Sequence, residues 1–207
     1  MKKKQNLKFW GSLTAFAIFS AVAGLRLLHG FDLWALRVSQ VWTTSFLDRT
    51  GGIFSILGGV EFTIPAFGAL VVWLFLTNRR TLAVRLAIAL LVTSLVELAM
   101  KMWLPQVPMP EGVARTTGFS PVIDVHYAYP YPSGHMLRSV LLLGAIYLLW
   151  KNKVARFLIV LALIGMALSR IYLGVHWASD VIGGTVLGIA GLVWAFDQGK
   201  KRITKWR

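Results

Sequence analysis

The sequence predicts an all-α protein, a six-transmembrane helix bundle with its N- and C-termini on the cytoplasmic side. Hydrophobic residues make up 57% of the 207 positions and charged residues only 14%, whereas charged residues make up roughly 25% of a typical soluble domain. A soluble chain of this length cannot bury so much apolar surface, so the composition argues against disorder and against a soluble fold. Residues 1–207 are interpreted as a single integral-membrane domain.

Six apolar stretches account for the predicted spans, because a membrane-spanning helix requires about 20 mostly apolar residues. The fourth stretch is the shortest of the six. The stretches are Phe9–Leu28, Phe54–Thr77, Leu82–Trp103, Ser133–Trp150, Val154–Tyr172 and Trp177–Phe196.

The first stretch follows a lysine-rich start and passes through Ala21-Val22-Ala23, a pattern that also occurs in cleavable signal peptides. The apolar run continues through Leu25, Leu27 and Leu28, which makes it long enough to span a bilayer. We interpret it as a retained first helix, and its removal would leave the orientation of the other helices unchanged.

Two segments outside the six stretches are distinctive. In Phe31–Leu47, apolar residues recur at roughly helical spacing, which fits an amphipathic helix in the outer interface or a short connector packed on the bundle. The segment Leu104–Pro132 contains six of the seven prolines and cannot be helical throughout. Long irregular loops in compact domains are often functional.

Positive charge gives the predicted bundle its orientation. Fifteen of the 22 Lys and Arg residues precede the first stretch, follow the sixth, or lie in the connections around 79–85 and 151–156. Because cytoplasmic loops concentrate Lys and Arg, these segments are predicted to be cytoplasmic. The net charge of +14 therefore indicates topology in a plasma (inner) membrane and not nucleic-acid binding. The absence of cysteine excludes thiolate metal sites and cysteine nucleophiles.

Two motifs lie on the predicted outer side. Pro132-Ser133-Gly134-His135 stands where the proline-rich segment meets the fourth stretch. Glycine lets the backbone approach a ligand closely, and the start of a helix offers unpaired N–H groups to an anion. The motif is therefore a candidate anion-binding turn.

The second motif runs from Ser169-Arg170 to His176 and Asp180, across the end of the fifth stretch and the start of the sixth. A spacing of four residues places His176 and Asp180 on one helix face. The carboxylate can then hold the Nδ1–H group and present Nε2 as a nucleophile. The guanidinium of Arg170 suits phosphate oxygens.

Single ionisable residues in a membrane protein are often packing or ion-pair residues, which is our interpretation of Arg26 and His29. Two histidines, an arginine and an aspartate that converge on one membrane face are functional candidates by default. The functional prediction therefore rests on the combination of these residues and not on one isolated side chain.

The motifs PSGH and SRxxxxxHxxxD resemble the second and third signatures of the type-2 phosphatidic acid phosphatase and vanadium haloperoxidase superfamily. The six stretches resemble its integral-membrane lipid phosphatase branch. The resemblance implies that His176 attacks phosphorus to form a phosphohistidine, that Asp180 orients His176, and that His135 protonates the leaving group. It further implies that no metal ion or other cofactor takes part. The residues that it assigns to phosphate binding are Lys101, Ser133, Gly134 and Arg170.

The first family signature, which reads Lys, six residues and Arg-Pro, is incomplete. Lys101 stands at the end of the third stretch, but Pro108-Met109 replaces the Arg-Pro. Arg138 and Arg115 are the candidate substitutes, and Arg138 is favoured because it lies three residues after His135 on the same helix face. The alternative is that Arg138 forms a structural ion pair with Glu61 or Glu97.

The resemblance implies metal-independent hydrolysis of a phosphomonoester or pyrophosphate on a lipid at the outer membrane–water interface. Undecaprenyl pyrophosphate is the favoured substrate, ahead of phosphatidylglycerol phosphate and phosphatidic acid. A lipid-linked phosphotransferase and a catalytically weak lipid-binding membrane protein are the alternatives. A transporter is disfavoured because the sequence shows no inverted repeat. The expected partners are the bilayer and the lipid substrate, and the oligomeric state is left open.

Overall fold

The computed structural model describes residues 2–117 and 127–197, which form eight helices and no strand. This confirms the predicted all-α class. The helices are α1 (Lys2–Gly24), α2 (His29–Ser39), α3 (Ser45–Gly58), α4 (Val60–Leu76), α5 (Arg80–Trp103), α6 (Gly134–Leu149), α7 (Lys153–Tyr172) and α8 (Ala178–Asp197).

Four of these helices, α1, α5, α7 and α8, are long and apolar enough to cross a membrane. The bent pair α3–α4 passes the same test when its two helices are taken together. Helix α6 has 16 residues, and at about 1.5 Å per residue it is shorter than a hydrocarbon core of about 30 Å. The described residues thus contain four or five candidate spans, and the count of six stays a prediction.

The structure corrects the helix predicted over Phe54–Thr77. Helix α3 begins at Ser45, where the Thr44 hydroxyl accepts a hydrogen bond from the Leu47 amide, and it ends at Gly58. Gly59 has an extended backbone conformation, and α4 leaves it at an angle of 47° to α3. The expected single helix is therefore two helices, because the extended residue at position 59 interrupts the hydrogen-bond ladder.

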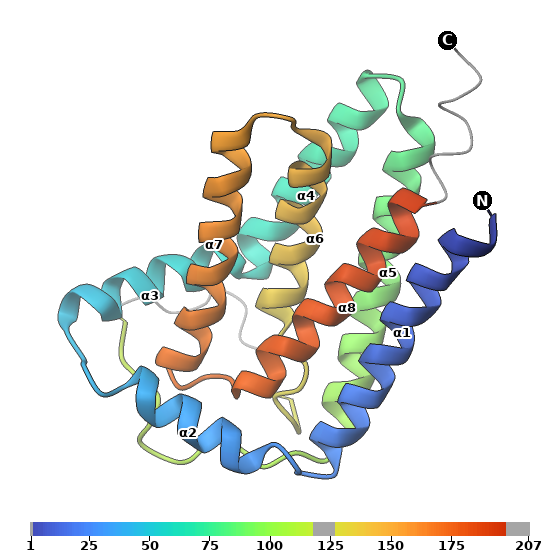
Figure 1. Cartoon of the computed structure of the whole chain (residues 1–207). Coiled ribbons are helices and arrows are strands. Elements are labelled where there is room, and N and C mark those ends of the chain that lie inside the picture. The colour runs from blue at the N-terminus through green and yellow to red at the C-terminus, as the bar shows by residue number, and fades with distance from the viewer. Residues whose placement is uncertain (1, 118–126, 198–207) are drawn as a thin grey trace.

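The helix expected within Phe31–Leu47 exists but covers only part of that range. Helix α2 ends at Ser39, residues 40–44 are not helical, and the last three residues of the range belong to α3. Large apolar side chains of α2 such as Phe31, Trp34 and Val38 are exposed. Figure 1 shows α2 lying across one end of the bundle, opposite the start of α1 and the end of α8.

Helix α8 is the centre of the bundle. It packs against α6, α1 and α5, and α1 and α5 run beside it in Figure 1. Of its best 18-residue apolar window, 61% is buried, compared with 17% in α7. The side of α8 that faces α6 is lined by glycines: a Cβ atom on Gly184 would overlap the Ser133 carbonyl, and one on Gly188 would lie 2.8 Å from Val140. The absence of side chains lets the two helices approach closely.

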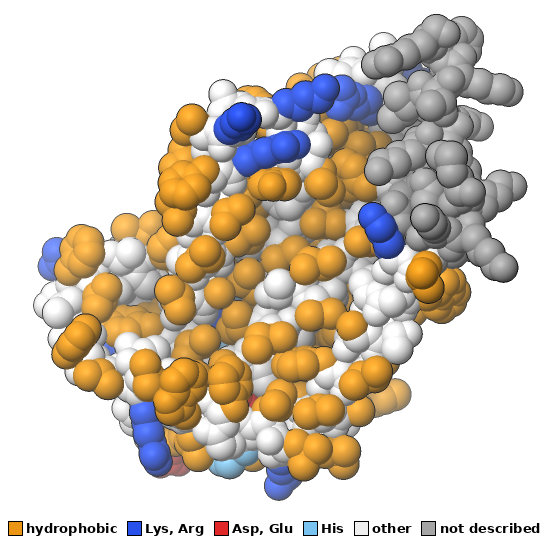
Figure 2. Space-filling view, in the orientation of Figure 1, with side chains coloured by type: hydrophobic (Ala, Val, Ile, Leu, Met, Phe, Trp, Pro, Cys, Tyr) orange, Lys and Arg blue, Asp and Glu red, His pale blue; other side chains and the backbone are white. Residues whose placement is uncertain are grey.

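The surface fits a protein that spans a membrane. Figure 2 shows hydrophobic side chains over the middle of the visible face and Lys and Arg gathered at the upper end, over the α6–α7 turn. Lys151 and Lys153 in that turn are exposed. Charges at the end and apolar side chains on the middle are the distribution that a bilayer requires.

Replacing Gly188 with leucine is expected to destabilise the protein, because the new side chain must displace Val140 or separate α6 from α8. Overpacking of this kind costs about 1–3 kcal/mol. The free energy of unfolding in mixed micelles is the measurement. Gly11→Leu is the matched control, since no atom lies within 4 Å of a Cβ at Gly11, and an equal loss in both variants would contradict the close-packing role of Gly188.

Candidate active site

The start of α6, the end of α7 and the start of α8 meet at the end of the bundle that α2 covers (Figure 1). The Ser133 amide donates a hydrogen bond of 2.9 Å to the Asp180 carbonyl, which joins the two sequence motifs directly. Ser133 and Asp180 are both completely buried. The structure therefore brings together the two motifs that the sequence analysis expected on one face.

His176 and Asp180 form a hydrogen-bonded pair. The distance between His176 Nδ1 and Asp180 Oδ2 is 3.2 Å, and the same carboxylate oxygen accepts a hydrogen bond of 2.9 Å from the Trp177 amide. Helix α8 begins at Ala178, so His176 lies in the turn before it and not on its face. The pair still forms because Asp180 reaches back over the first turn of α8.

The electrostatic environment of His176 favours a neutral ring. Burial lowers the pKa of His176, although its hydrogen bond with Asp180 opposes this shift. When the ring proton is on Nδ1, Asp180 accepts its hydrogen bond and Nε2 keeps a free lone pair. A buried neutral imidazole held in this way has the chemistry of a nucleophile.

The tight turn before His176 depends on Gly174. This residue has a φ of +64°, and a Cβ atom there would overlap the backbone of Val113. A positive φ is accessible to glycine without steric cost. The turn between α7 and α8 can therefore be short enough to hold His176 against Asp180.

Cationic groups surround the second histidine. Lys101 of α5, Arg138 of α6 and Arg170 of α7 all interact electrostatically with His135, as does His176. Three helices thus deliver one fixed cation each to the same small region. Such a cluster is suited to an anion with several negatively charged oxygens.

Several buried hydrogen-bond donors in this region are left free. Ser133 Oγ, Arg138 Nε and Arg170 Nε have no hydrogen-bond partner within the described part of the chain. Buried polar atoms are nearly always paired in folded proteins. A phosphate group has the acceptor oxygens that these donors lack, so the free buried donors make this region a candidate phosphate site.

Each of the two arginines is held by another nitrogen of its guanidinium group. Arg170 Nη1 donates a hydrogen bond of 2.8 Å to Ser55 Oγ, and Arg138 Nη1 lies 3.2 Å from Glu97 Oε2. These contacts leave Nε of each arginine available. Ser55, on α3, was missed by sequence reasoning, because no motif or spacing connects it with Arg170 before the chain is folded.

Glu97 connects the cations of α5 and α6. Its Oε1 atom lies 3.1 Å from Lys101 Nζ while its Oε2 atom contacts Arg138, and the side chains of all three residues are largely buried. A Cβ atom on Gly134 would overlap the Glu97 carboxylate. The ion pair of Arg138 with Glu97, which the sequence analysis gave as the alternative to a phosphate-binding role, is therefore present.

Tyr127 also contacts the Lys101 ammonium group. The ring centroid of Tyr127 lies 4.2 Å from Lys101 Nζ, a distance typical of a cation–π contact. The end of the proline-rich segment is thus in contact with the site. Its described parts, residues 104–117 and 127–132, are largely irregular, as its prolines predict.

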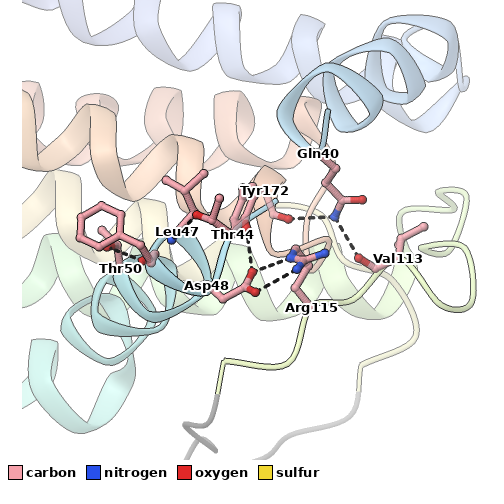
Figure 3. Close-up of polar contacts among 9 residues, drawn as sticks. Gln40, Thr44, Leu47, Asp48, Thr50, Val113, Arg115 and Tyr172 are labelled. Atoms are coloured by element: carbon pink, nitrogen blue, oxygen red, sulfur yellow. Dashed lines mark hydrogen bonds and ion pairs between the residues drawn. The ribbon is translucent and has the colours of Figure 1, made fainter. Parts of the chain in front are cut away.

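Arg115 is engaged elsewhere. Figure 3 shows its guanidinium in a two-point contact with Asp48, whose carboxylate also accepts a hydrogen bond of 2.7 Å from the Tyr172 hydroxyl. The hydrogen bond to Asp48 raises the pKa of Arg115 above its ordinary value. Gln40 adds hydrogen bonds to the carbonyl oxygens of Val113 and Tyr172. Arg115 therefore ties the proline-rich segment to α3 and α7, and the role of Arg138 as the substitute for the missing arginine stays a prediction.

Comparisons with known proteins identify a family model and two sequence relatives that match this chain. The family model for the PAP2 superfamily matches residues 82–204. The Escherichia coli (strain K12) protein named "Putative undecaprenyl-diphosphatase YbjG" is 32% identical over 156 residues, which are 70% of this chain and 74% of that protein. An undecaprenyl-diphosphatase of Sulfolobus acidocaldarius is 43% identical over 63 residues, 29% of each chain.

One solved structure has a similar fold over nearly the whole chain. It is the crystal structure of a transmembrane PAP2 type phosphatidylglycerolphosphate phosphatase from Bacillus subtilis. The TM-score is 0.75 at 18% sequence identity, with 97% of this chain and 100% of that chain covered. At this identity the likeness shows the fold alone.

Arg138→Met is expected to weaken binding of orthovanadate, a phosphate analogue, by about 10- to 100-fold, because it removes a charge-assisted hydrogen bond from the anion site. Arg115→Met is the matched control, since its guanidinium contacts Asp48 instead, and we expect a change within about twofold. Ligand-induced shifts of the melting temperature over a vanadate titration measure both. The reverse order would assign the anion contact to Arg115.

Proposed function

Since this chain belongs to the PAP2 superfamily, we propose that it is a metal-independent lipid phosphatase of the PAP2 type that acts through a phosphohistidine. The observation that carries the proposal is the set of free buried donors, Ser133 Oγ, Arg138 Nε and Arg170 Nε, in the region of the two histidines. Preorganised donors of this kind stabilise the charge of a phosphoryl group in transfer.

In the proposed first step, Nε2 of His176 attacks phosphorus in line with the bond to the leaving oxygen. The P–N bond forms as the P–O bond breaks, and His135 donates a proton to the leaving oxygen. Asp180 accepts a hydrogen bond from Nδ1–H throughout, which stabilises the positive charge that develops on the ring. The result is a phosphohistidine and a lipid product with one phosphate fewer.

In the proposed second step, water attacks the phosphorus of the phosphohistidine. His135, now neutral, accepts the proton of that water as the P–N bond breaks. Inorganic phosphate leaves, and His176 returns to its starting state. Through both steps the phosphoryl oxygens are bound by Arg138, Arg170 and the PSGH turn, with Lys101 as a further cation.

A lipid substrate is supported by the apolar surface and by the position of the site at one end of the bundle. Undecaprenyl pyrophosphate is the proposed substrate, because proteins from Escherichia coli and Sulfolobus acidocaldarius that are 32% and 43% identical carry the name undecaprenyl-diphosphatase. Phosphatidylglycerol phosphate, the substrate in the name of the Bacillus subtilis structure, and phosphatidic acid are the next candidates.

The site is proposed to face the extracytoplasmic side of the plasma membrane. The basic connections α4–α5 and α6–α7 lie at the end of the bundle opposite α2 and the site (Figure 1). Because basic connections remain in the cytoplasm, the site lies at the outer leaflet, and the start of α1 and the end of α8 lie inside. A substrate exposed on the outer leaflet then reaches the site without crossing the membrane.

The decisive experiment is phosphate release by the purified protein in detergent with EDTA, over a panel of undecaprenyl pyrophosphate, phosphatidylglycerol phosphate and phosphatidic acid. We expect release to be fastest with undecaprenyl pyrophosphate. His176→Ala is expected to lower kcat by about 10³-fold or more, because it removes the nucleophile. Lys151→Gln is the control and is expected to retain activity, since Lys151 is exposed in the α6–α7 turn at the opposite end of the bundle.

Three results would contradict parts of the proposal. Full activity of His176→Ala would show that His176 is not the nucleophile. Loss of activity in EDTA that a divalent ion restores would refute the metal-independent mechanism. Transfer of labelled phosphate to an added lipid or sugar alcohol, in preference to water, would identify a phosphotransferase with the same intermediate.

A further inference from the structure

We infer that Asp32, on the outer helix α2, is a positioning residue for the His176–Asp180 pair, because it caps the start of α8 from a different part of the chain. The inference rests on the proposed role of His176 as the nucleophile. It assigns a role in the reaction to a segment that the sequence analysis interpreted as an interfacial helix or a connector packed on the bundle.

Asp32 differs from the rest of α2. Only Asp32 and Leu36 are buried in this helix, and the Asp32 side chain is 4% exposed. Its Oδ1 atom accepts a hydrogen bond of 2.8 Å from the Ser179 amide, and its Oδ2 atom accepts one of 2.7 Å from the Ser179 hydroxyl. Both carboxylate oxygens thus accept hydrogen bonds from a single residue, Ser179, which is the immediate neighbour of Asp180.

The start of α8 needs this contact. The first amides of a helix have no partner within the helix, and a Ser, Thr, Asp or Asn side chain just before the helix usually accepts from one of them. Here that position is Trp177, which has no side-chain oxygen. Asp180, in the first turn, reaches back to the Trp177 amide, which is half of a capping box. Asp32 contributes the other acceptor from α2.

The other contacts of this turn fix the same group of residues. The Ser179 hydroxyl also accepts a hydrogen bond of 3.0 Å from Gln106 Nε2, and Trp177 Nε1 donates one of 2.7 Å to the Val107 carbonyl. The segment that follows α5 and the outer helix α2 therefore meet at residues 177–179. These three residues connect His176 with Asp180, so their position sets the geometry of the pair.

The same carboxylate of Asp180 that accepts from the Trp177 amide also lies against His176 Nδ1. A shift of the first turn of α8 would therefore move the carboxylate and the ring together, away from the anion site on α6 and α7. A small displacement of a reacting group strongly lowers the reaction rate. Substrate affinity is expected to depend mainly on Arg138 and Arg170, which Asp32 does not contact.

Asp32→Asn tests the inference, because the amide keeps one acceptor oxygen and loses the other. We expect kcat for the best lipid substrate to fall about tenfold, the effect of one lost buried hydrogen bond, and KM to change less than about twofold. Arg37→Gln, an exposed change on the same helix, is expected to leave both constants unchanged. Leu36→Ala removes the other buried side chain of α2, and we expect it to lower the melting temperature with kcat within about twofold.

A second readout does not require turnover. The ¹⁵N and ¹H imidazole signals of His176, assigned with His176→Gln, are expected to shift in Asp32→Asn and to stay in place in Arg37→Gln and Leu36→Ala. If the wild-type protein hydrolyses no lipid phosphate but the signals shift in this pattern, the proposed function is wrong and the positioning role stands.

Two outcomes would overturn the inference. In the first, Asp32→Asn changes neither kcat nor the His176 signals, so the contact with Ser179 does not govern the pair. In the second, Leu36→Ala reproduces both effects, so Asp32 serves only to attach α2 to the bundle. An equal rise in KM and fall in kcat would also contradict a role confined to the His176–Asp180 pair.

Discussion

The close packing of α6 against α8 is the contact on which the site depends. Glycines at 184 and 188 remove the side chains that would hold the helices apart, and the Ser133 amide then reaches the Asp180 carbonyl. This contact places the PSGH turn beside the turn that carries His176. The glycines of α8 therefore influence the candidate site at a distance, because they set the separation between the turns that carry His135 and His176.

Burying three cations in a small volume imposes the second constraint. Lys101, Arg138 and Arg170 repel one another, and each must be held by neutral or anionic groups when no phosphate is bound. Glu97 holds two of them and Ser55 holds the third. Because only some nitrogens are used in this way, the charges are fixed in position while donors remain free. The arrangement explains how the region can be stable without a ligand and still present free hydrogen-bond donors.

The sequence predicted the helical class, the PSGH and His176–Asp180 motifs and their convergence, because each depends on local spacing or on the composition of long apolar stretches. It did not predict the break at Gly59, since one extended residue leaves the apolar pattern unchanged. Ser55 and Asp32 could not be found either. Their partners, Arg170 and Ser179, are more than 100 positions away, and only the packing of α3 and α2 on the bundle brings these pairs together.

The missing arginine of the first signature becomes intelligible from the geometry of Glu97. Arg138, the substitute that we propose, extends from α6 and shares its counter-ion, Glu97, with Lys101. This route requires that the Glu97 carboxylate lie against the start of α6, where only a residue without a Cβ atom fits. Gly134 therefore makes room for the carboxylate that pairs with Arg138, the proposed substitute cation. The contact of Arg115 with Asp48 ties the first part of the proline-rich segment to α3, so under this proposal the cation that replaces the signature's arginine comes from α6.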